Sequence, residues 1–263
     1  MGSVNSQSAD GRDEVASARA ASAPVIDADP NDSHAALSHQ TVRPSPESTL
    51  PDSPRAWHSP AAWARLLLVL ALALVLDLGS KTWAFHNVAG TPVKLDRKTL
   101  LADPDWNVPH HPGVHALPWG LLDLQLVINR GAVFGIGANR RFFFIAFTLG
   151  ALAAGMLVFG RFTHVNNRLA HIAIGLILAG GIGNLYDRIV FGVVRDFLHM
   201  LPDRNLPFGW TWPGGSPEMF PWVFNLADTM LLTGMGLLIL HMHRHEKRQR
   251  TAAAAVAAPA TAG

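Results

Sequence analysis

The segment Phe142–Phe159 reads FFFIAFTLGALAAGMLVF and has no charged side chain over its 18 residues. A helix needs about 20 mainly apolar residues to cross a bilayer, because each residue advances it by about 1.5 Å. Three further segments have this character: Ala61–Phe85, Leu169–Tyr186 and Phe220–Leu240. Soluble helices of this length keep a polar face, which these segments lack. The sequence therefore predicts an all-α integral membrane protein, a bundle of four transmembrane helices.

The composition supports this fold class and excludes several functions. Of the 263 residues 49% are apolar and only 15% are charged, against about 25% charged in soluble domains. The net charge is +2 and the basic excess lies mostly near the C-terminus, which argues against nucleic-acid binding. The chain has no cysteine, so thiol nucleophiles, cysteine-bound metals and disulfides are excluded.

The two ends of the chain differ from its middle. Residues 1–58 are rich in Ala, Ser, Asp and Pro, with few large apolar side chains to bury. Such a segment does not offset its ordering entropy, so we expect a disordered tail. It is acidic and long, unlike a secretory signal. We take 59–245 as the membrane domain and expect a second disordered tail over 246–263.

Charges flanking the spans predict their orientation. The stretch His241–Arg250 carries four basic residues and one acid, and Gly160–Arg168 carries two basic residues and no acid. By the positive-inside rule both are cytoplasmic, and four spans then place both termini in the cytoplasm. The long connections His86–Arg141 and Ile189–Met219 fall outside. We expect them to form a small β-containing cap.

Polar side chains gather at the outer ends of these predicted spans. They are Asp77 and Lys81 in the first, Asn129 before the second, Asn184, Asp187 and Arg188 ending the third, Asp196 just beyond, and Asn225 and Asp228 in the fourth. At 1.5 Å per residue, Asp228 lies about 12 Å below the predicted start of its span. Ionisable residues inside a span are costly and mark functional sites.

Several of these residues allow two interpretations. Asp77 and Lys81 are four residues apart on one helix face, which suits mutual neutralisation as well as substrate contact. Asp187 and Arg188 suit an ion pair at the helix end, or an arginine that binds peptide carbonyls. The histidines His241, His243 and His245 fit a solvated basic tail better than a metal site, so we predict no metal.

The pair Asp196 and Asp228 suggests a specific chemistry. Two carboxylates in a partly dry site do not both ionise cheaply, so they share one proton. The ionised partner then takes a proton from water, and the protonated one polarises a carbonyl oxygen. The two carboxyl groups of aspartic peptidases have these same two roles, and the chemistry needs no cofactor.

Five segments of the chain, in order, resemble the successive motifs of bacterial lipoprotein signal peptidases (type II signal peptidases). They are Asp77-Leu-Gly-Ser-Lys81, Asn129-Arg-Gly-Ala-Val-Phe-Gly135, Gly180-Gly-Ile-Gly-Asn-Leu-Tyr-Asp-Arg188, Gly192-Val-Val-Arg-Asp-Phe197 and Phe224-Asn-Leu-Ala-Asp228. The resemblance covers about residues 60–245. It implies a multi-pass aspartic endopeptidase of the inner membrane, a hydrolase that cuts diacylglyceryl-modified prolipoproteins just before the lipidated cysteine.

The resemblance also implies roles for individual residues. Asp196 and Asp228 match the catalytic dyad. Asn129, Asn184, Arg188 and Asn225 match residues that orient the substrate and the dyad. Asp77 and Lys81 match the first motif, with a role in either structure or substrate contact. The implied partners are prolipoproteins and membrane lipids, and we expect a monomer.

The chain departs from the family pattern in its long N-terminal tail, in an expanded loop 86–119 and in an inserted stretch 202–221. The alternatives to a peptidase are a proton-coupled transporter and a non-catalytic membrane scaffold. A transporter would distribute acids across the bilayer and show an internal repeat. Neither feature is present in the sequence, and a scaffold has no need of paired carboxylates beside asparagines.

Overall fold

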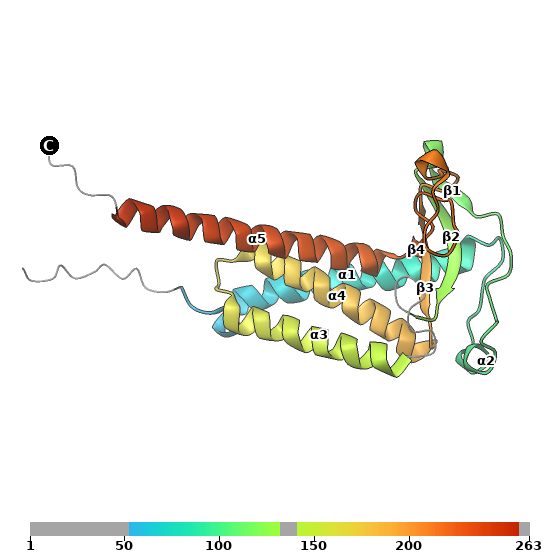
Figure 1. The fold of residues 1–263 in the computed structure, drawn as a ribbon. Coiled ribbons are helices and arrows are strands. Elements are labelled where there is room, and N and C mark those ends of the chain that lie inside the picture. The colour runs from blue at the N-terminus through green and yellow to red at the C-terminus, as the bar shows by residue number, and fades with distance from the viewer. Residues whose placement is uncertain (1–52, 132–140, 258–263) are drawn as a thin grey trace, which may run out of the picture. The chain divides into compact units, whose positions relative to one another are not determined.

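The computed structural model describes residues 53–131 and 141–257. Within them four helices are long and apolar enough to cross a membrane. They are α1 (Pro60–Asn87), α3 (Arg141–Phe162), α4 (Arg168–Val190) and α5 (Leu226–Ala257). The predicted four-span bundle is therefore confirmed (Figure 1).

Helix α4 packs against each of the other three spans. Most of its apolar stretch is buried, whereas the spans α1, α3 and α5 expose large apolar side chains such as Leu72, Phe147 and Leu232. Glycine allows the close approach of α4 to α5, because a Cβ at Gly180 would overlap the backbone carbonyl of Ala227. The exposed apolar surfaces are those expected to face lipid.

Helix α5 begins later than the sequence predicted. The expected span started at Phe220, but the helix starts at Leu226, and Val223–Phe224 forms strand β4 instead. Apolar residues suit a buried strand as well as a helix, so hydropathy alone misplaced this boundary. Asp228 therefore lies in the first turn of α5 and not about 12 Å inside it, as 1.5 Å per residue had implied.

Helix α5 also ends later than predicted. The expectation of disorder from residue 246 is wrong for 246–257, which continue the helix to Ala257. An ion pair four residues apart, Arg250 Nη2 to Glu246 Oε1 at 2.5 Å, supports this part. The alanines that follow are the strongest helix formers. Residues 258–263 lie outside the described residues.

The start of the membrane domain is likewise earlier than residue 59. A short 3-10 turn, η1 (Ala56–His58), packs on the connection between α3 and α4. The Ala56 N–H donates to the carbonyl of Thr163 at 2.9 Å, and the Ala56 side chain is buried. Residues 53–58 thus belong to the folded domain, and the predicted tail over 1–52 lies outside the described residues.

A small antiparallel sheet lies across one end of the helices, as predicted for the cap (Figure 1). Its strands, in order, are β1 (Val114–Leu117), β2 (Leu122–Asn129), β3 (Val194–Met200) and β4 (Val223–Phe224). The register pairs Val127 with Asp196 and Leu198 with Phe224.

The apolar face of the sheet packs on the end of α1. Leu126 of β2 and Phe197 of β3 form a buried cluster with Phe85 of α1 and with Leu100 of the short helix α2 (Arg97–Ala102). Arg130 holds α2 in place, since its Nη1 donates to the carbonyl of Leu100 at 2.6 Å. This packing fixes β3, and therefore Asp196, relative to the spans.

Candidate active site

Asp228 is oriented by the N-terminal cap of α5. Asn225 precedes the helix, and its side-chain Oδ1 accepts a hydrogen bond from the Asp228 N–H at 3.2 Å. In return Asp228 Oδ2 accepts from the Asn225 N–H at 3.1 Å. This reciprocal arrangement is a capping box, which satisfies two backbone donors that a helix start leaves free. The Asp228 carboxylate is therefore held at the positive end of the helix.

Asn225 also links Asp228 to Asp196. Its Nδ2 donates to Asp196 Oδ1 at 2.6 Å and to Asn184 Oδ1 at 3.1 Å. Asn184 in turn donates from Nδ2 to Asp228 Oδ1 at 2.8 Å. The structure thus brings Asp196, from a strand, and Asp228, from a helix, to the same asparagine, Asn225, and Asn184 bonds to both Asn225 and Asp228.

The two carboxyl groups differ in their surroundings. Asp196 is 2% exposed, whereas Asp228 is partly exposed. Burial of Asp196, reinforced by the nearby charge of Asp228, raises its pKa to about 7, even though Asn225 and Asn129 donate hydrogen bonds to it. Asp196 is therefore suited to hold a proton near neutral pH, and Asp228 is the more accessible of the two.

Arg188 and Asn129 lie beside the carboxyl pair and are partly exposed. Arg188 donates from Nη1 to the carbonyl of Asn184 at 3.3 Å, and its guanidinium interacts electrostatically with Asp228 and Asp196. That cation lies 5.4 Å from the centroid of the Phe144 ring. Both residues have polar groups that an incoming peptide backbone can reach.

Asp77 and Lys81 are fully buried and bond to the residues around the site. Lys81 Nζ donates to Asp77 Oδ2 and to Asn184 Oδ1, each at 2.9 Å. Asp77 Oδ1 accepts from the N–H of Ala227, another free donor of the α5 start, at 2.9 Å. Of the two interpretations left open by the sequence, this geometry favours neutralisation and positioning over substrate contact.

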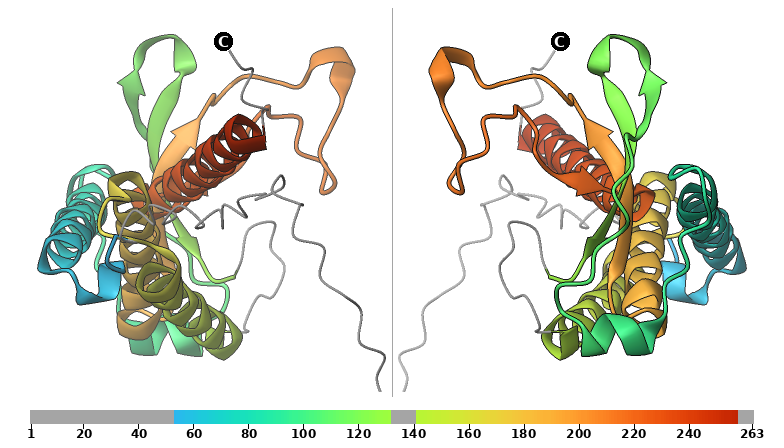
Figure 2. Two further views of the ribbon diagram at one scale, coloured as in Figure 1. Left: turned by 90° about the vertical axis from the view of Figure 1, so that its left-hand side faces the viewer. Right: turned by 90° about the vertical axis from the view of Figure 1, so that its right-hand side faces the viewer.

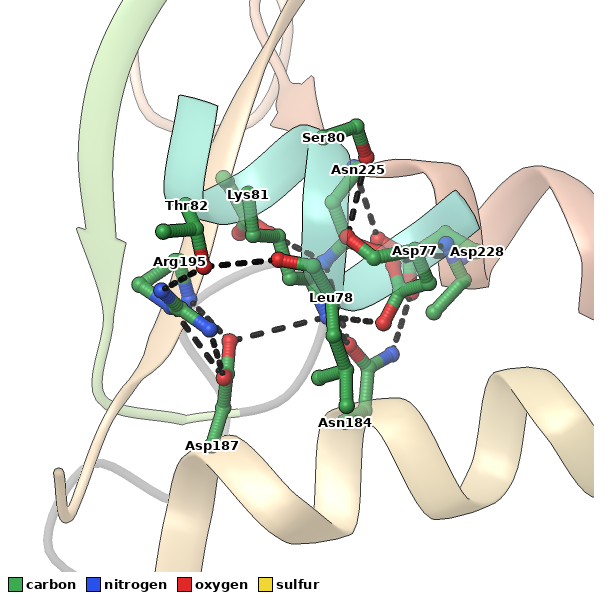
Figure 3. A network of polar contacts seen from close by, with 12 residues as sticks. Asp77, Leu78, Ser80, Lys81, Thr82, Asn184, Asp187, Arg195, Asn225 and Asp228 are labelled. Carbon is green, nitrogen blue, oxygen red and sulfur yellow. Dashed lines mark hydrogen bonds and ion pairs between the residues drawn. The ribbon is translucent and has the colours of Figure 1, made fainter. Parts of the chain in front are cut away.

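Asp187 pairs with residues other than its neighbour in sequence. Arg195 donates to Asp187 Oδ1 from Nη2 at 2.8 Å and from Nε at 3.2 Å, and Lys81 Nζ lies 3.5 Å from Oδ2 (Figure 3). The suggested ion pair of Asp187 with Arg188 is thus replaced by one with Arg195 of β3. Sequence reasoning missed Arg195, although a charged residue beside Asp196 in a short strand was a usable signal.

Other predicted features lie outside this cluster or outside the described residues. His241, His243 and His245 lie around the middle of α5, away from its first turn. Among the residues that the structure describes, no group of three or more His, Cys, Asp or Glu side chains could hold a metal ion. Of the second motif, Asn129–Gly131 is described, and residues 132–135 are not.

Comparisons with known proteins identify the family to which a chain with these site residues belongs. The sequence model of the family described as signal peptidase (SPase) II matches residues 69–244, which include all the site residues above. The chain belongs to the signal peptidase II family. Family membership makes it a peptidase, and its four apolar helices make it a multi-pass membrane protein.

Individual relatives agree with this family assignment. The lipoprotein signal peptidase of Geobacter metallireducens is 38% identical over 157 residues, covering 59% of this chain and 86% of the relative. That of Symbiobacterium thermophilum is 39% identical over 129 residues, covering 49% of this chain and 74% of the relative. A solved bacterial membrane enzyme is 23% identical, with a TM-score of 0.50 over 70% of this chain and 91% of its own, which supports the fold alone.

Proposed function

We propose that this signal peptidase II family member is an intramembrane aspartic endopeptidase. It removes the signal peptide from diacylglyceryl-modified prolipoproteins by cutting just before the lipidated cysteine. One observation carries the proposal: Asn225 holds both carboxyl groups, donating from its side chain to Asp196 and from its backbone to Asp228.

The surroundings of the two carboxyl groups suggest which one is the general base and which one is the general acid. Asp228 accepts hydrogen bonds from Asn184 and Asn225 at the start of α5 and is partly exposed, so a water molecule can reach it. Asp196 is buried and has a raised pKa, so it is the partner that carries the shared proton. Asp228 is accordingly the general base and Asp196 the general acid.

The reaction then balances without a metal or cofactor. Asp228 removes a proton from a water whose oxygen attacks the scissile carbonyl carbon, while Asp196 donates its proton to the carbonyl oxygen. The resulting tetrahedral intermediate collapses as the C–N bond breaks: Asp228 passes the proton it took from water to the nitrogen of the lipidated cysteine, and Asp196 takes a proton back from a hydroxyl of the intermediate. The products are a carboxylic acid on the signal peptide and an amine on the lipoprotein, and both aspartates are back in their starting states.

The remaining polar residues divide into two groups. Arg188 and Asn129 are partly exposed and adjoin the pair, so they are the residues that bind the substrate backbone. Asp77 and Lys81 are positioning residues, which fix the start of α5 and the orientation of Asn184.

The location of the site suits a substrate anchored in the bilayer. Basic residues in the connection between α3 and α4 and along the end of α5 support cytoplasmic termini by the positive-inside rule. The site then lies near the extracytoplasmic face of the inner membrane, where the signal helix ends. The lipid chains of the substrate stay in the bilayer beside the apolar spans, and a single chain suffices.

Purified protein incubated with a lipidated precursor peptide provides the test. We expect one cut, before the lipidated cysteine, identified by mass spectrometry, and no cut in a precursor without the diacylglyceryl group. In cells that depend on the Asp196→Asn or Asp228→Asn variant, lipidated precursor should accumulate while the variant inserts normally. An uncut precursor would instead favour a transporter or a non-catalytic scaffold, and normal processing by either variant would remove that residue from the dyad.

A further inference from the structure

Two short turns at the margin of the sheet share one sequence pattern. Pro118-Trp119-Gly120 (η2) joins β1 to β2, and Pro207-Phe208-Gly209 (η4) lies in the segment between β3 and β4. Each is a 3-10 turn closed by a hydrogen bond to its proline carbonyl, from Leu121 N–H at 3.4 Å and from Trp210 N–H at 3.3 Å. We call these the two aromatic turns.

Both turns hold a bulky residue in a strained backbone conformation. Trp119 has a φ of 59° and Phe208 a φ of 62°, in the left-handed region that bulky side chains avoid. In the described part of the chain, the other non-glycine residues with positive φ are Leu201 and Asp203, in the segment that leads to the second turn. Backbone strain of this kind persists where the surrounding structure enforces it, and it commonly marks function.

The strain is not compensated by burial of the aromatic rings. The Trp119 side chain is 79% exposed and that of Phe208 is 90% exposed. Trp210, whose ring centroid lies 6.0 Å from that of Phe208, is 65% exposed. A large apolar ring held outward in this way points to a partner outside the folded chain.

The position of the two turns identifies that partner. The first turn is tied to the segment that leads to the second, since Leu201 N–H donates to the carbonyl of Leu121 at 3.1 Å and Arg204 Nη2 to that of Trp119 at 3.3 Å. Figure 1 shows this end of the sheet projecting past the start of α5, and Figure 2 shows the orange segment reaching out beside that helix. In a membrane the space along α5 is filled by lipid, because Leu232 and Ile239 are exposed there.

We propose that the two aromatic turns anchor the sheet in the lipid headgroup region beside α5. Tryptophan and phenylalanine rings favour this region, where an apolar body meets a hydrated surface. The anchor would hold the sheet, which carries Asn129 on β2 and Asp196 on β3, at a constant height against Asp228 on α5. The inference uses the membrane topology but does not depend on the cleavage chemistry.

The absence of cysteine allows a direct test with site-specific probes. Leu117→Cys, next to the first turn and half exposed, is labelled with a fluorophore and the full chain is placed in lipid nanodiscs. Lipids brominated near the headgroup should quench the probe strongly. The same label on Asp105→Cys, an exposed position in the loop after α2, should be quenched by aqueous iodide instead.

The matched variant removes the rings and keeps the reporter. Trp119→Ser with Phe208→Ser should abolish most of the quenching by brominated lipid at residue 117 and increase quenching by iodide. Circular dichroism and the melting temperature show whether the variant is folded, and Phe208→Cys labelled with Trp119 intact gives a second reporter if it is not. Lipid quenching unchanged by the double substitution overturns the proposal.

Adding substrate to the labelled protein tests whether the turns bind substrate instead of lipid. A probe that lipid does not quench, but that responds when lipidated precursor is added, would overturn the proposal and make the turns a substrate-docking surface. Cleavage activity is measured separately on the same samples. An inactive chain with lipid-quenched probes contradicts the proposed function alone, whereas an active chain with unquenched probes contradicts the anchor alone.

Discussion

Asn225 and Asp228 bond to each other in both directions at the first turn of α5, with the Asn225 side chain accepting at 3.2 Å and the Asp228 side chain accepting at 3.1 Å. A helix cap is usually a matter of stability. Here the capping side chain is also the donor to Asp196. The same residue therefore stabilises α5 and sets the geometry of the proposed dyad.

Replacing Asn225 should separate these two effects. Serine also caps helices well, so Asn225→Ser should keep the melting temperature close to that of the wild type but lose most of the cleavage activity, because no amide remains to hold Asp196. Asn225→Ala should lose activity and also about 1 kcal/mol of stability. Thermal unfolding in detergent and a precursor-cleavage assay measure both. An active Asn225→Ser variant would contradict the role of the amide.

The buried charges around Lys81 should be much more sensitive than charges on the surface. Lys81→Met leaves Asp77 and Asp187 without their shared cation, and breaking a buried pair in this way costs about 3 to 5 kcal/mol. Lys98→Met, the same substitution at an exposed position, should leave the melting temperature nearly unchanged. Equal melting temperatures for the two variants would show that the buried network contributes little.

The rate of cleavage should fall as the pH rises through about 7, where Asp196 loses the proton that the mechanism requires. Because its pKa in the unfolded chain is near 4, the folded state binds this proton more tightly. The carboxyl therefore reduces the free energy of unfolding as pH rises from about 4 to about 7. Asp196→Asn should remove that dependence in urea unfolding. A cleavage rate that stays flat across neutral pH would contradict the assignment of Asp196 as the acid.

Gly183 should tolerate no side chain. An added Cβ there would overlap the carboxylate of Asp77, whereas a Cβ at Gly236 of α5 meets nothing within 4 Å. Gly183→Ala should therefore lower both the melting temperature and cleavage, while Gly236→Ala should preserve both. Normal activity in Gly183→Ala would indicate that Asp77 can move without consequence for the site.

Much of this architecture was predictable from the sequence, for identifiable physical reasons. Long uncharged runs have few interpretations other than spans, so four helices followed directly. The residue at which α5 starts was not predictable, because an apolar stretch such as Phe220–Phe224 suits a buried strand as well as a helix. The ion pair of Arg195 with Asp187 was not predictable from the sequence either. Successive strand residues point to opposite faces, so Arg195 and Asp196 contact different parts of the site.

The central claim is that Asp196 and Asp228 act together on one water. Its most direct test is the rate at which purified Asp228→Asn, with the melting temperature of the wild type, cleaves a lipidated precursor in the same membrane mimetic. We predict that cleavage falls to the background level, as it should for Asp196→Asn and for the double variant. Cleavage by folded Asp228→Asn at the wild-type rate would contradict the account.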